Sequence, residues 1–323
     1  MHISVIGTGS WGCALAQVWA RSGHNVTLYG RSDDVIDGIN HAFTHPSFTD
    51  AILHPSIRAE KIPDTFPDTD LFIYALPAQV MRTFVSDHTF QGNSPFMIVS
   101  KGIDISTGKL LSEVAKESGK IKGSTAILSG PNFAAEVMKG LPSASTIATE
   151  NTQIADRLAQ ELSTSTFRLY HTDDMIGIQV GGSLKNVMSI ACGLSDGLNM
   201  GNNARAALIT RGLAEMARMT STFGGNRETL MGLSGMGDLI LTCTSPQSRN
   251  YRYGVSCAQN GIHVPTETVE GASTIKAIIP IIKKNHLDMP ICQAIDAVLN
   301  GVIPLDKCMS FLMDRPLRGY ENI

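Results

Sequence analysis

The first half of the chain alternates short apolar segments with longer segments of helical periodicity. The apolar segments are rich in β-branched or aromatic side chains, as buried strands are. They are Ile3–Ile6, Asn25–Tyr29, Leu71–Leu76, Phe96–Ser100, Thr125–Leu128, Ala144–Ala148 and Phe167–Tyr170. The helical segments are Gly12–Arg21, Ala78–Val85, Gly108–Glu117 and Ile154–Leu162. This alternation predicts a doubly wound, mostly parallel sheet covered on both faces, with right-handed crossovers.

From about Asp173 the strand pattern ends and only helical periodicity remains. The predicted helices are Met175–Leu194, Arg205–Phe223, Thr274–Lys284 and Ile291–Asn300, and the glycine-rich segments Gly197–Asn203 and Leu233–Asp238 are predicted to be loops. We therefore expect an α/β domain over residues 1–172 and an all-helical domain over residues 173–323, with the boundary near Tyr170–Asp174. A length of 323 residues suits two domains.

Composition excludes several classes of protein. Hydrophobic residues make up 43%, enough for a sizeable core, so a generally disordered chain is excluded. The formal net charge of −3 argues against a nucleic-acid footprint or a polybasic membrane anchor. No apolar run approaches the ~20 residues that cross a bilayer. The first residues lead from a short apolar segment straight into glycine, which indicates a strand and not a signal peptide. We expect a cytoplasmic protein.

The cysteines give no sign of a metal site or a disulfide framework. No two of them form a C-x-x-C pair, and none stands in a tight His/Cys cluster. The six are Cys13, Cys192, Cys243, Cys257, Cys292 and Cys308. We expect reduced, small apolar side chains that fill the core, as in a cytosolic protein, and no bound metal.

The segment Gly7-Thr8-Gly9-Ser10-Trp11-Gly12 is a G-x-G-x-x-G motif in the right context, because it follows a predicted strand and opens a predicted helix. Gly7 would permit the tight turn, Gly9 would let a pyrophosphate approach the backbone, and Gly12 would let helix and strand pack closely. The helix N-terminus would then face the phosphates. The motif predicts a dinucleotide site; a tight turn without a ligand is the alternative.

The second predicted strand ends in Tyr29-Gly30-Arg31. Strict NAD enzymes place an acidic residue here to bind the ribose 2′-hydroxyl, whereas a guanidinium can pair with a 2′-phosphate. Arg31 therefore favours NADP(H), with NAD(H) tolerated. The alternative is that Arg31 stacks on the adenine or points into solvent.

Two loops follow strands of the predicted sheet, where ligands of such sheets bind. Lys101 comes directly after one strand and could hold an anionic group, or it could be a solvated lysine in a turn. In the second loop Gly130 and Pro131 set a turn, and Asn132 resembles a helix N-cap. That loop could be purely structural.

Polar residues of the helical half offer candidates for acid–base chemistry. Lys185 lies in an otherwise apolar helix beside paired glycines, and a partly desolvated lysine has a lowered pKa and can exchange a proton with a carbonyl oxygen. A solvated helix face would also explain it. Asp238, in a glycine-rich segment, could orient Lys185 or cap a helix. Ser248-Arg249-Asn250 could form a phosphate cradle or a solvated loop.

Together these motifs resemble the bacterial NAD(P)-dependent glycerol-3-phosphate dehydrogenases over essentially the whole chain. The blocks that carry the resemblance are Gly7–Gly12, Ser100–Gly102, Ser129–Pro131, Gly181–Val187, Ala206–Met216, Gly235–Thr244 and Ser248–Asn250. The resemblance implies a Rossmann-type nucleotide-binding domain followed by a helical domain, as in 6-phosphogluconate-dehydrogenase-like folds. It also implies reversible reduction of dihydroxyacetone phosphate to sn-glycerol 3-phosphate, a phospholipid precursor, and a homodimer.

The resemblance also implies a role for each candidate residue. Lys185 would be the catalytic lysine that donates a proton to the carbonyl oxygen, with Asp238 and Asn186 beside it. The other implied substrate contacts are Lys101, Gly130, Asn132, Ser248, Arg249 and Asn250. The implied cofactor contacts are Gly7, Gly9, Ser10, Trp11, Gly12, Arg31, Lys101, Ala134, Arg249 and Glu270.

The chain departs from the family pattern in two places. Asn132 stands where Ser or Thr is usual, which predicts a modest change in binding, since an amide still offers a donor and an acceptor. The stretch from Gly254 to Val269 is shorter than usual, which weakens the implied role of Glu270 and could mean a truncated helix.

Two other functions fit parts of the sequence. A related two-domain dehydrogenase could act on a different hydroxy or keto acid, although Lys101 and Arg249 favour a phosphate substrate. A nucleotide sensor without turnover would need neither Lys185 nor Asp238, yet both are present.

Overall fold

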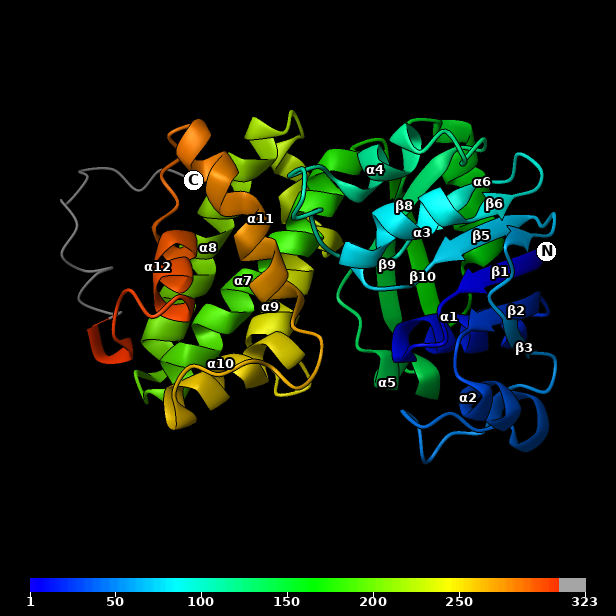
Figure 1. Ribbon diagram of the computed structural model, residues 1–323, viewed down its shortest axis with the longest axis horizontal. Coiled ribbons are helices and arrows are strands. Elements are labelled where there is room, and N and C mark those ends of the chain that lie inside the picture. Colours follow the sequence, from blue (N-terminus) through cyan, green and yellow to red (C-terminus); the bar gives the residue numbers. More distant parts are fainter. Residues whose placement is uncertain (308–323) are drawn as a thin grey trace. The chain divides into compact units, whose positions relative to one another are not determined.

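The computed structural model describes residues 1–307, which form two compact units (Figure 1). Unit 1 comprises residues 1–100 and 111–175, and unit 2 comprises residues 101–110 and, within the described part, residues 176–307. Cys308 therefore lies outside the described residues. The other five cysteines are buried free thiols. No helix of the described part combines the length and the apolar character needed to span a bilayer.

Unit 1 is built on an eight-stranded sheet in the order β10-β9-β8-β7-β5-β1-β2-β3. The strands are β1 His2–Ile6, β2 Asn25–Gly30, β3 Arg58–Lys61, β5 Leu71–Tyr74, β7 Phe96–Ile98, β8 Thr125–Ser129, β9 Ser143–Ala148 and β10 Phe167–Thr172. All neighbours pair in parallel except β8 with β9, which are antiparallel. The predicted doubly wound, mostly parallel sheet is confirmed.

Helices cover both faces of this sheet because its strands are apolar on both sides. In β5, Leu71 and Ile73 join one core cluster with residues of α1 (Ser10–Arg21), α5 (Ala134–Lys139) and α6 (Thr152–Leu162). Phe72 and Tyr74 alternate with them, as the pleat requires, and contact an aromatic group on the opposite side.

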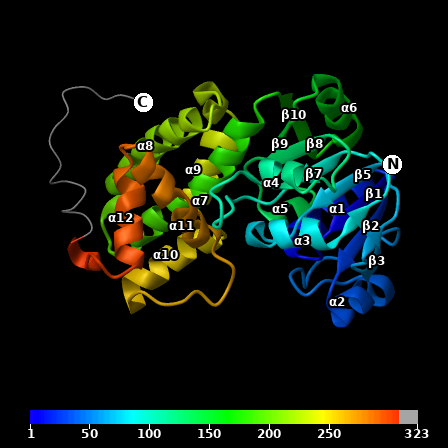
Figure 2. The same cartoon turned by 45° about the horizontal axis from the view of Figure 1, so that its top comes forward.

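The aromatic group comes from the elements that lie between β3 and β7 along the chain. It includes Phe66, which stacks on Phe90 across the two-stranded sheet β4 (Thr65–Phe66) and β6 (Thr89–Phe90), and Phe84 of α3 (Met81–Asp87). The single turn Ala78–Val80 precedes α3, and α3 lies beside α4 (Leu111–Glu117) on this face (Figures 1 and 2).

The sequence pattern missed several short elements of unit 1. They are β3, α5, the two strands β4 and β6, α2 (Asp33–Asp37) and the π-helical turn Gly38–Ala42 that continues it. Each has few residues, and β3 is mostly exposed at the sheet edge, so none shows a clear apolar period.

In unit 2, the regular structure of residues 176–307 is entirely helical. Its elements are α7 (Met175–Gly197), α8 (Gly201–Thr222), α9 (Asp238–Cys243), α10 (Arg249–Asn260), α11 (Glu270–Lys284), α12 (Pro290–Leu299) and short turns at Arg227–Met231, Leu233–Gly237 and Leu305–Lys307. The buried α7 forms the centre of the core, and glycines bring α10 close to it. A Cβ at Gly193 would lie 2.1 Å from the Tyr251 carbonyl oxygen, and one at Gly254 would lie 2.3 Å from that of Ile190.

One segment predicted as a loop is helical, and so is one for which a solvated loop was an alternative. Leu233–Gly237 is a π-helical turn that runs into α9, because Gly235 packs directly on the backbone of Leu230, where a Cβ would lie 2.2 Å from the carbonyl oxygen. The polar run Ser248–Arg252 is the start of α10. The Ser248 side chain caps the N-terminus of this helix, because its hydroxyl oxygen accepts a hydrogen bond from the Tyr251 N–H at 3.2 Å. Helix α8 also begins earlier than predicted, at Gly201.

Residues 101–110 form a small hairpin that belongs to unit 2, although the chain on both sides belongs to unit 1. Ile103 and Leu110 face each other across the hairpin and are buried in the core of unit 2. At its turn the buried Asp104 accepts bonds from the hydroxyl groups of Ser106 and Thr107. The hairpin thereby anchors Lys101 in the unit that contains Lys185.

Candidate functional site

In the glycine loop of unit 1, the fold requires two of the three glycines of the motif but not the third. Gly7 has φ +122°, a conformation that side chains rarely adopt, and a Cβ at Gly12 would lie 2.4 Å from the Gly7 carbonyl oxygen. At Gly9 a Cβ would meet nothing within 4 Å. Packing within the protein therefore explains Gly7 and Gly12, whereas Gly9 leaves open space above the backbone where α1 begins. No protein atom there would prevent a pyrophosphate from approaching the backbone of Gly9.

The remaining cofactor candidates of unit 1 lie near this loop or on elements beside it. Gly30 packs on Thr8, since a Cβ there would lie 2.5 Å from the Thr8 methyl carbon, and the exposed Arg31 follows directly. Trp11 is half-buried against the core, and Ala134 opens α5, which packs on α1.

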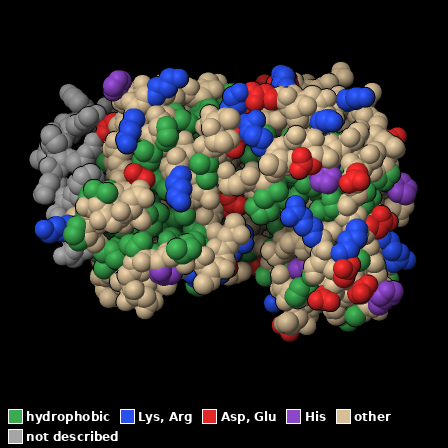
Figure 3. Space-filling view, viewed as in Figure 1, with side chains coloured by type: hydrophobic (Ala, Val, Ile, Leu, Met, Phe, Trp, Pro, Cys, Tyr) green, Lys and Arg blue, Asp and Glu red, His purple; other side chains and the backbone are tan. Residues whose placement is uncertain are grey.

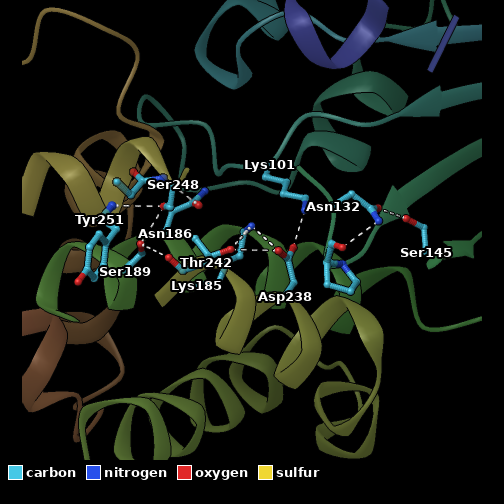
Figure 4. A network of polar contacts seen from close by, with 12 residues as sticks. Lys101, Asn132, Ser145, Lys185, Asn186, Ser189, Asp238, Thr242, Ser248 and Tyr251 are labelled. Carbon is cyan, nitrogen blue, oxygen red and sulfur yellow. Dashed lines mark hydrogen bonds and ion pairs between the residues drawn. The ribbon is translucent and has the colours of Figure 1, made fainter. Parts of the chain in front are cut away.

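Unit 2 holds a cluster of charged side chains that is almost closed to solvent. Asp238 is 0% exposed, and its two carboxylate oxygens accept from two lysines, Lys185 and Lys101, each at 2.5 Å (Figure 4). Lys185 is 7% exposed. The structure thus brings together three of the predicted residues, from α7, α9 and the 101–110 hairpin.

Two residues that the sequence analysis missed hold this cluster in place. Thr242, one turn after Asp238 on α9, accepts from the Lys185 ammonium group at 2.8 Å and donates to Asp238 at 3.1 Å. Ser189, one turn after Lys185 on α7, donates to the Thr242 carbonyl at 2.9 Å and lies 3.0 Å from the Ser248 hydroxyl. The i, i+4 spacing from Lys185 and from Asp238 is the signal that could have found them.

Burial and charge set the protonation of Lys185. Desolvation lowers the pKa of Lys185 from its ordinary 10.5 to about 8, and the Lys101 ammonium adds to the fall, while the Asp238 carboxylate opposes it. A group with this pKa can both give and take a proton near neutral pH, as a general acid–base catalyst must.

A second polar chain connects α7, α10 and α11. The Asn250 amide donates to the Asn186 side-chain oxygen at 3.0 Å and accepts from the Gly271 N–H at 2.9 Å. Gly271 fits against α7 only without a side chain, because a Cβ would lie 2.6 Å from the Asn186 carbonyl oxygen. Asn186 follows Lys185 in the sequence, and Asn250 follows Arg249. These hydrogen bonds and this close packing fix the orientation of both amide side chains.

The other predicted residues belong to neither of these two groups of hydrogen bonds. Arg249 is exposed at the start of α10, and the half-buried Glu270 opens α11. In unit 1, Gly130 packs on β9, with a would-be Cβ 2.8 Å from the Ala144 carbonyl oxygen.

The prediction that Asn132 caps a helix is wrong. The N-cap position of α5 is Phe133, and the Asn132 amide instead donates to the carbonyls of Pro131 at 2.9 Å and Ala144 at 3.1 Å and accepts from Ser145. Asn132 thus ties the loop after β8 to β9. The capping alternative for Asp238 also fails, because its carboxylate binds lysines and makes no cap bond to α9.

Within residues 1–307, no group of three or more His, Cys, Asp or Glu side chains is arranged to hold a metal ion.

Comparison with known proteins places the chain in a family. Residues 2–155 match the family model described as NAD-dependent glycerol-3-phosphate dehydrogenase N-terminus, and residues 174–310 match the corresponding C-terminus. A curated relative from Parvibaculum lavamentivorans, glycerol-3-phosphate dehydrogenase [NAD(P)+], is 39% identical over 98% of this chain and 97% of its own length.

Comparison with solved structures leads to the same family. The 2.1 Å crystal structure of glycerol-3-phosphate dehydrogenase from Coxiella burnetii has 32% identity and a TM-score of 0.86, covering 97% of this chain and 99% of that one. A D-mandelate dehydrogenase shares the fold alone, at 14% identity and a TM-score of 0.64, covering 95% and 99%. The predicted resemblance is confirmed: this chain belongs to the NAD-dependent glycerol-3-phosphate dehydrogenase family.

Proposed function

We propose that this protein is an oxidoreductase that interconverts dihydroxyacetone phosphate and sn-glycerol 3-phosphate, and thereby supplies glycerophospholipid synthesis. The observation that carries the proposal is the buried Lys185–Asp238–Lys101 cluster in a chain of this family. When bound, the nicotinamide supplies or accepts the hydride at C2 of the substrate. The chain itself must bind the two reactants and move one proton.

Lys185 moves that proton. In the direction of reduction, its ammonium group donates to the carbonyl oxygen of the substrate, and in the direction of oxidation the neutral amine accepts the hydroxyl proton. Asp238 and Thr242 orient the Lys185 amine through bonds of 2.5 and 2.8 Å. These partners also stabilise the ammonium form, which is the form that donates the proton during reduction.

Cationic and amide groups of unit 2 hold the substrate. Lys101 shares the Asp238 carboxylate with Lys185, so its ammonium lies next to the reacting group. We assign Arg249 and Asn250, with Ser248, to the phosphate end, since a guanidinium and amide N–H groups suit a phosphate dianion. Contacts from Gly130 and Asn132 of unit 1 follow from the family resemblance.

The nucleotide binds to unit 1 at Gly7, Gly9, Ser10, Trp11 and Gly12, and Arg31 lies at the end of the neighbouring strand. We assign the nucleotide to the domain of residues 1–172 and the substrate to the domain of residues 173–323. Ala134, Arg249 and Glu270 are the further cofactor contacts that the family resemblance suggests. We also propose a cytoplasmic homodimer.

The two alternatives lack comparable support. A hydroxy- or keto-acid dehydrogenase fits the fold, which D-mandelate dehydrogenase shares, but the family match covers both halves of this chain. A nucleotide sensor would not need a buried lysine held by two hydrogen-bonding groups.

The test follows NADPH and then NADH oxidation with dihydroxyacetone phosphate, with unphosphorylated dihydroxyacetone as the control. We expect turnover that requires the phosphate. Equal turnover of both ketones would move the substrate class away from phosphates. Nucleotide binding without turnover on either ketone would support the sensor.

A further inference from the structure

The carboxyl end of β3 carries a lysine that the sequence analysis did not consider. Lys61 is the last residue of this edge strand, and it pairs in register with Gly30, the last residue of β2. Gly30 in turn packs on Thr8 of the glycine loop. Gly30 thus connects Lys61 to the glycine loop. Lys61 lies beside the end of β2, where proteins of this fold bind the adenosine ribose of the cofactor.

Two contacts fix the Lys61 ammonium group next to Arg31. It donates to the Arg31 carbonyl oxygen at 2.8 Å and forms an ion pair of 2.7 Å with Asp33, which is three residues beyond Gly30. An ammonium group has three donors, and these two contacts use two of them. The Lys61 side chain is 54% exposed, so the third donor can reach a ligand from solvent.

The pairing of Lys61 with Asp33 bears directly on cofactor choice. NADPH carries a phosphate dianion on its ribose 2′-oxygen, where NADH carries a neutral hydroxyl group. An acidic side chain at the end of β2 accepts from that hydroxyl and repels the phosphate. Arg31 occupies the position of that acid, but Asp33, the first residue of α2, brings a carboxylate to the same corner. Lys61 neutralises this carboxylate and adds a cation beside Arg31.

The other charges at this corner are mainly acidic. Glu60 and Asp34 are exposed neighbours of Lys61 and Asp33, whereas Arg58 donates to the Pro55 carbonyl at the opposite end of β3. Figure 3 shows basic and acidic side chains interspersed over the region of α2 and β3. Without Lys61, the carboxylates of this corner would therefore outweigh the charge of Arg31.

We propose that Lys61 is a specificity-determining residue for NADP(H): it masks Asp33 and joins Arg31 in binding the ribose 2′-phosphate. The proposal rests on the nucleotide-binding part of the proposed function and not on the identity of the substrate. It deepens the role of Arg31, because that guanidinium alone would face an unmasked carboxylate.

The test measures dissociation constants for NADPH and NADH without substrate, by quenching of tryptophan fluorescence, since Trp11 lies in the glycine loop. For Lys61→Gln we expect NADPH binding to weaken by about tenfold or more, as for loss of one charge-assisted contact, and NADH binding to change less than about twofold. Retained NADH affinity also shows that the variant is folded.

A second substitution separates the two parts of the proposal. Asp33→Asn in the Lys61→Gln background removes the unmasked carboxylate, so NADPH affinity should partly recover. Lys116→Gln is the matched control, because Lys116 is an exposed lysine of unit 1 that pairs with Glu150 at 3.8 Å, far along the chain from β3.

Equal loss of both cofactors in Lys61→Gln, or loss of neither, would overturn the proposal. So would a failure of Asp33→Asn to restore NADPH binding. None of these results depends on turnover of dihydroxyacetone phosphate, so a failure of the proposed reaction would be seen separately.

Discussion

Lys185 combines deep burial with a charge, and this combination needs the neighbours that the structure provides. A buried ammonium group is stable only when acceptors replace its water, and Asp238 and Thr242 do so. The remaining cost of desolvation lowers the pKa of Lys185 to about 8. The residue is thus a usable acid in one direction and a usable base in the other.

The pH dependence follows from that pKa. Reduction needs the protonated amine, so kcat/KM for dihydroxyacetone phosphate should fall as pH rises through about 8, and oxidation of glycerol 3-phosphate should rise through the same range. Steady-state rates over pH in both directions measure this. Profiles that move the same way in both directions would contradict it.

The two charged neighbours of Lys185 should shift the midpoint of this pH dependence in opposite directions. Asp238 raises the pKa of Lys185 and Lys101 lowers it. Asp238→Asn should therefore shift the midpoint of the pH dependence to lower pH, and Lys101→Met should shift it to higher pH. Both shifts are expected whatever each substitution does to the absolute rate. Shifts of the same sign would remove Lys185 as the titrating group.

Sequence reasoning found Lys185 but could not decide between a solvated and a buried position. Its helix is apolar on one face, and a lysine within it fits either environment. Burial becomes apparent only when α9 brings Asp238 to Lys185 and the 101–110 hairpin brings Lys101 to Asp238. These two contacts span 53 and 137 residues of sequence. Local periodicity carries no information on contacts of that range.

At the scale of elements, the glycine loop allows a paired test. Gly12→Ala should destabilise unit 1, because the added Cβ would meet the Gly7 carbonyl oxygen at 2.4 Å inside the strand–helix turn. Gly9→Ala meets no protein atom within 4 Å, so it should leave the fold intact and instead weaken nucleotide binding.

Thermal melting and nucleotide titration of the two variants separate these effects. The account expects a lower melting temperature for Gly12→Ala and a weaker nucleotide affinity with near wild-type melting for Gly9→Ala. Unchanged nucleotide affinity in Gly9→Ala would mean that no pyrophosphate lies above this residue.

Elements with a clear apolar pattern were predictable, and those without one were not. The strands of the sheet centre and the helices α7 and α8 have enough apolar residues to show a period, whereas β3 and α5 have few. Helix α10 was missed because its first turn, Arg249–Arg252, is polar, although Asn250 and Tyr251 of that turn contact α7. The same short or polar elements carry Lys61, Ala134 and Arg249, so the positions of these residues came from the structure.

At the scale of the whole molecule, one buried carboxylate links helices and couples stability to pH. Glu215 of α8 is 0% exposed and accepts from the N–H groups of Ile291 at 2.6 Å and Cys292 at 3.1 Å, in the first turn of α12. Burial raises the pKa of Glu215 from 4.5 to about 7, although these N–H groups and Arg218 oppose the rise.

A raised carboxyl pKa means that the folded protein binds the proton more tightly than the unfolded chain. The contribution to stability is then complete below pH 4.5 and is lost as pH rises to about 7, with a slope of up to about 1.4 kcal/mol per pH unit. Urea unfolding at several pH values should show this slope in the wild type and a smaller one in Glu215→Gln. The exposed Glu228→Gln is the control, and an equal slope in all three proteins would assign the effect elsewhere.

The whole-chain resemblance was predictable because it rests on several blocks in a fixed order, and the family match confirms it. The place of residues 101–110 in unit 2 was not. That hairpin joins the core of unit 2 through Ile103 and Leu110, two apolar residues in a short segment that looks like an ordinary turn of the sheet domain.

The central claim, that Lys185 transfers the proton, is tested most directly by the turnover number of Lys185→Ala with saturating NADPH and dihydroxyacetone phosphate. The account predicts a fall in kcat of about 10²–10⁴-fold, the usual contribution of a positioned acid–base group, with nucleotide affinity close to that of the wild type. A kcat near the wild-type value, or lost nucleotide affinity with retained turnover, would contradict it.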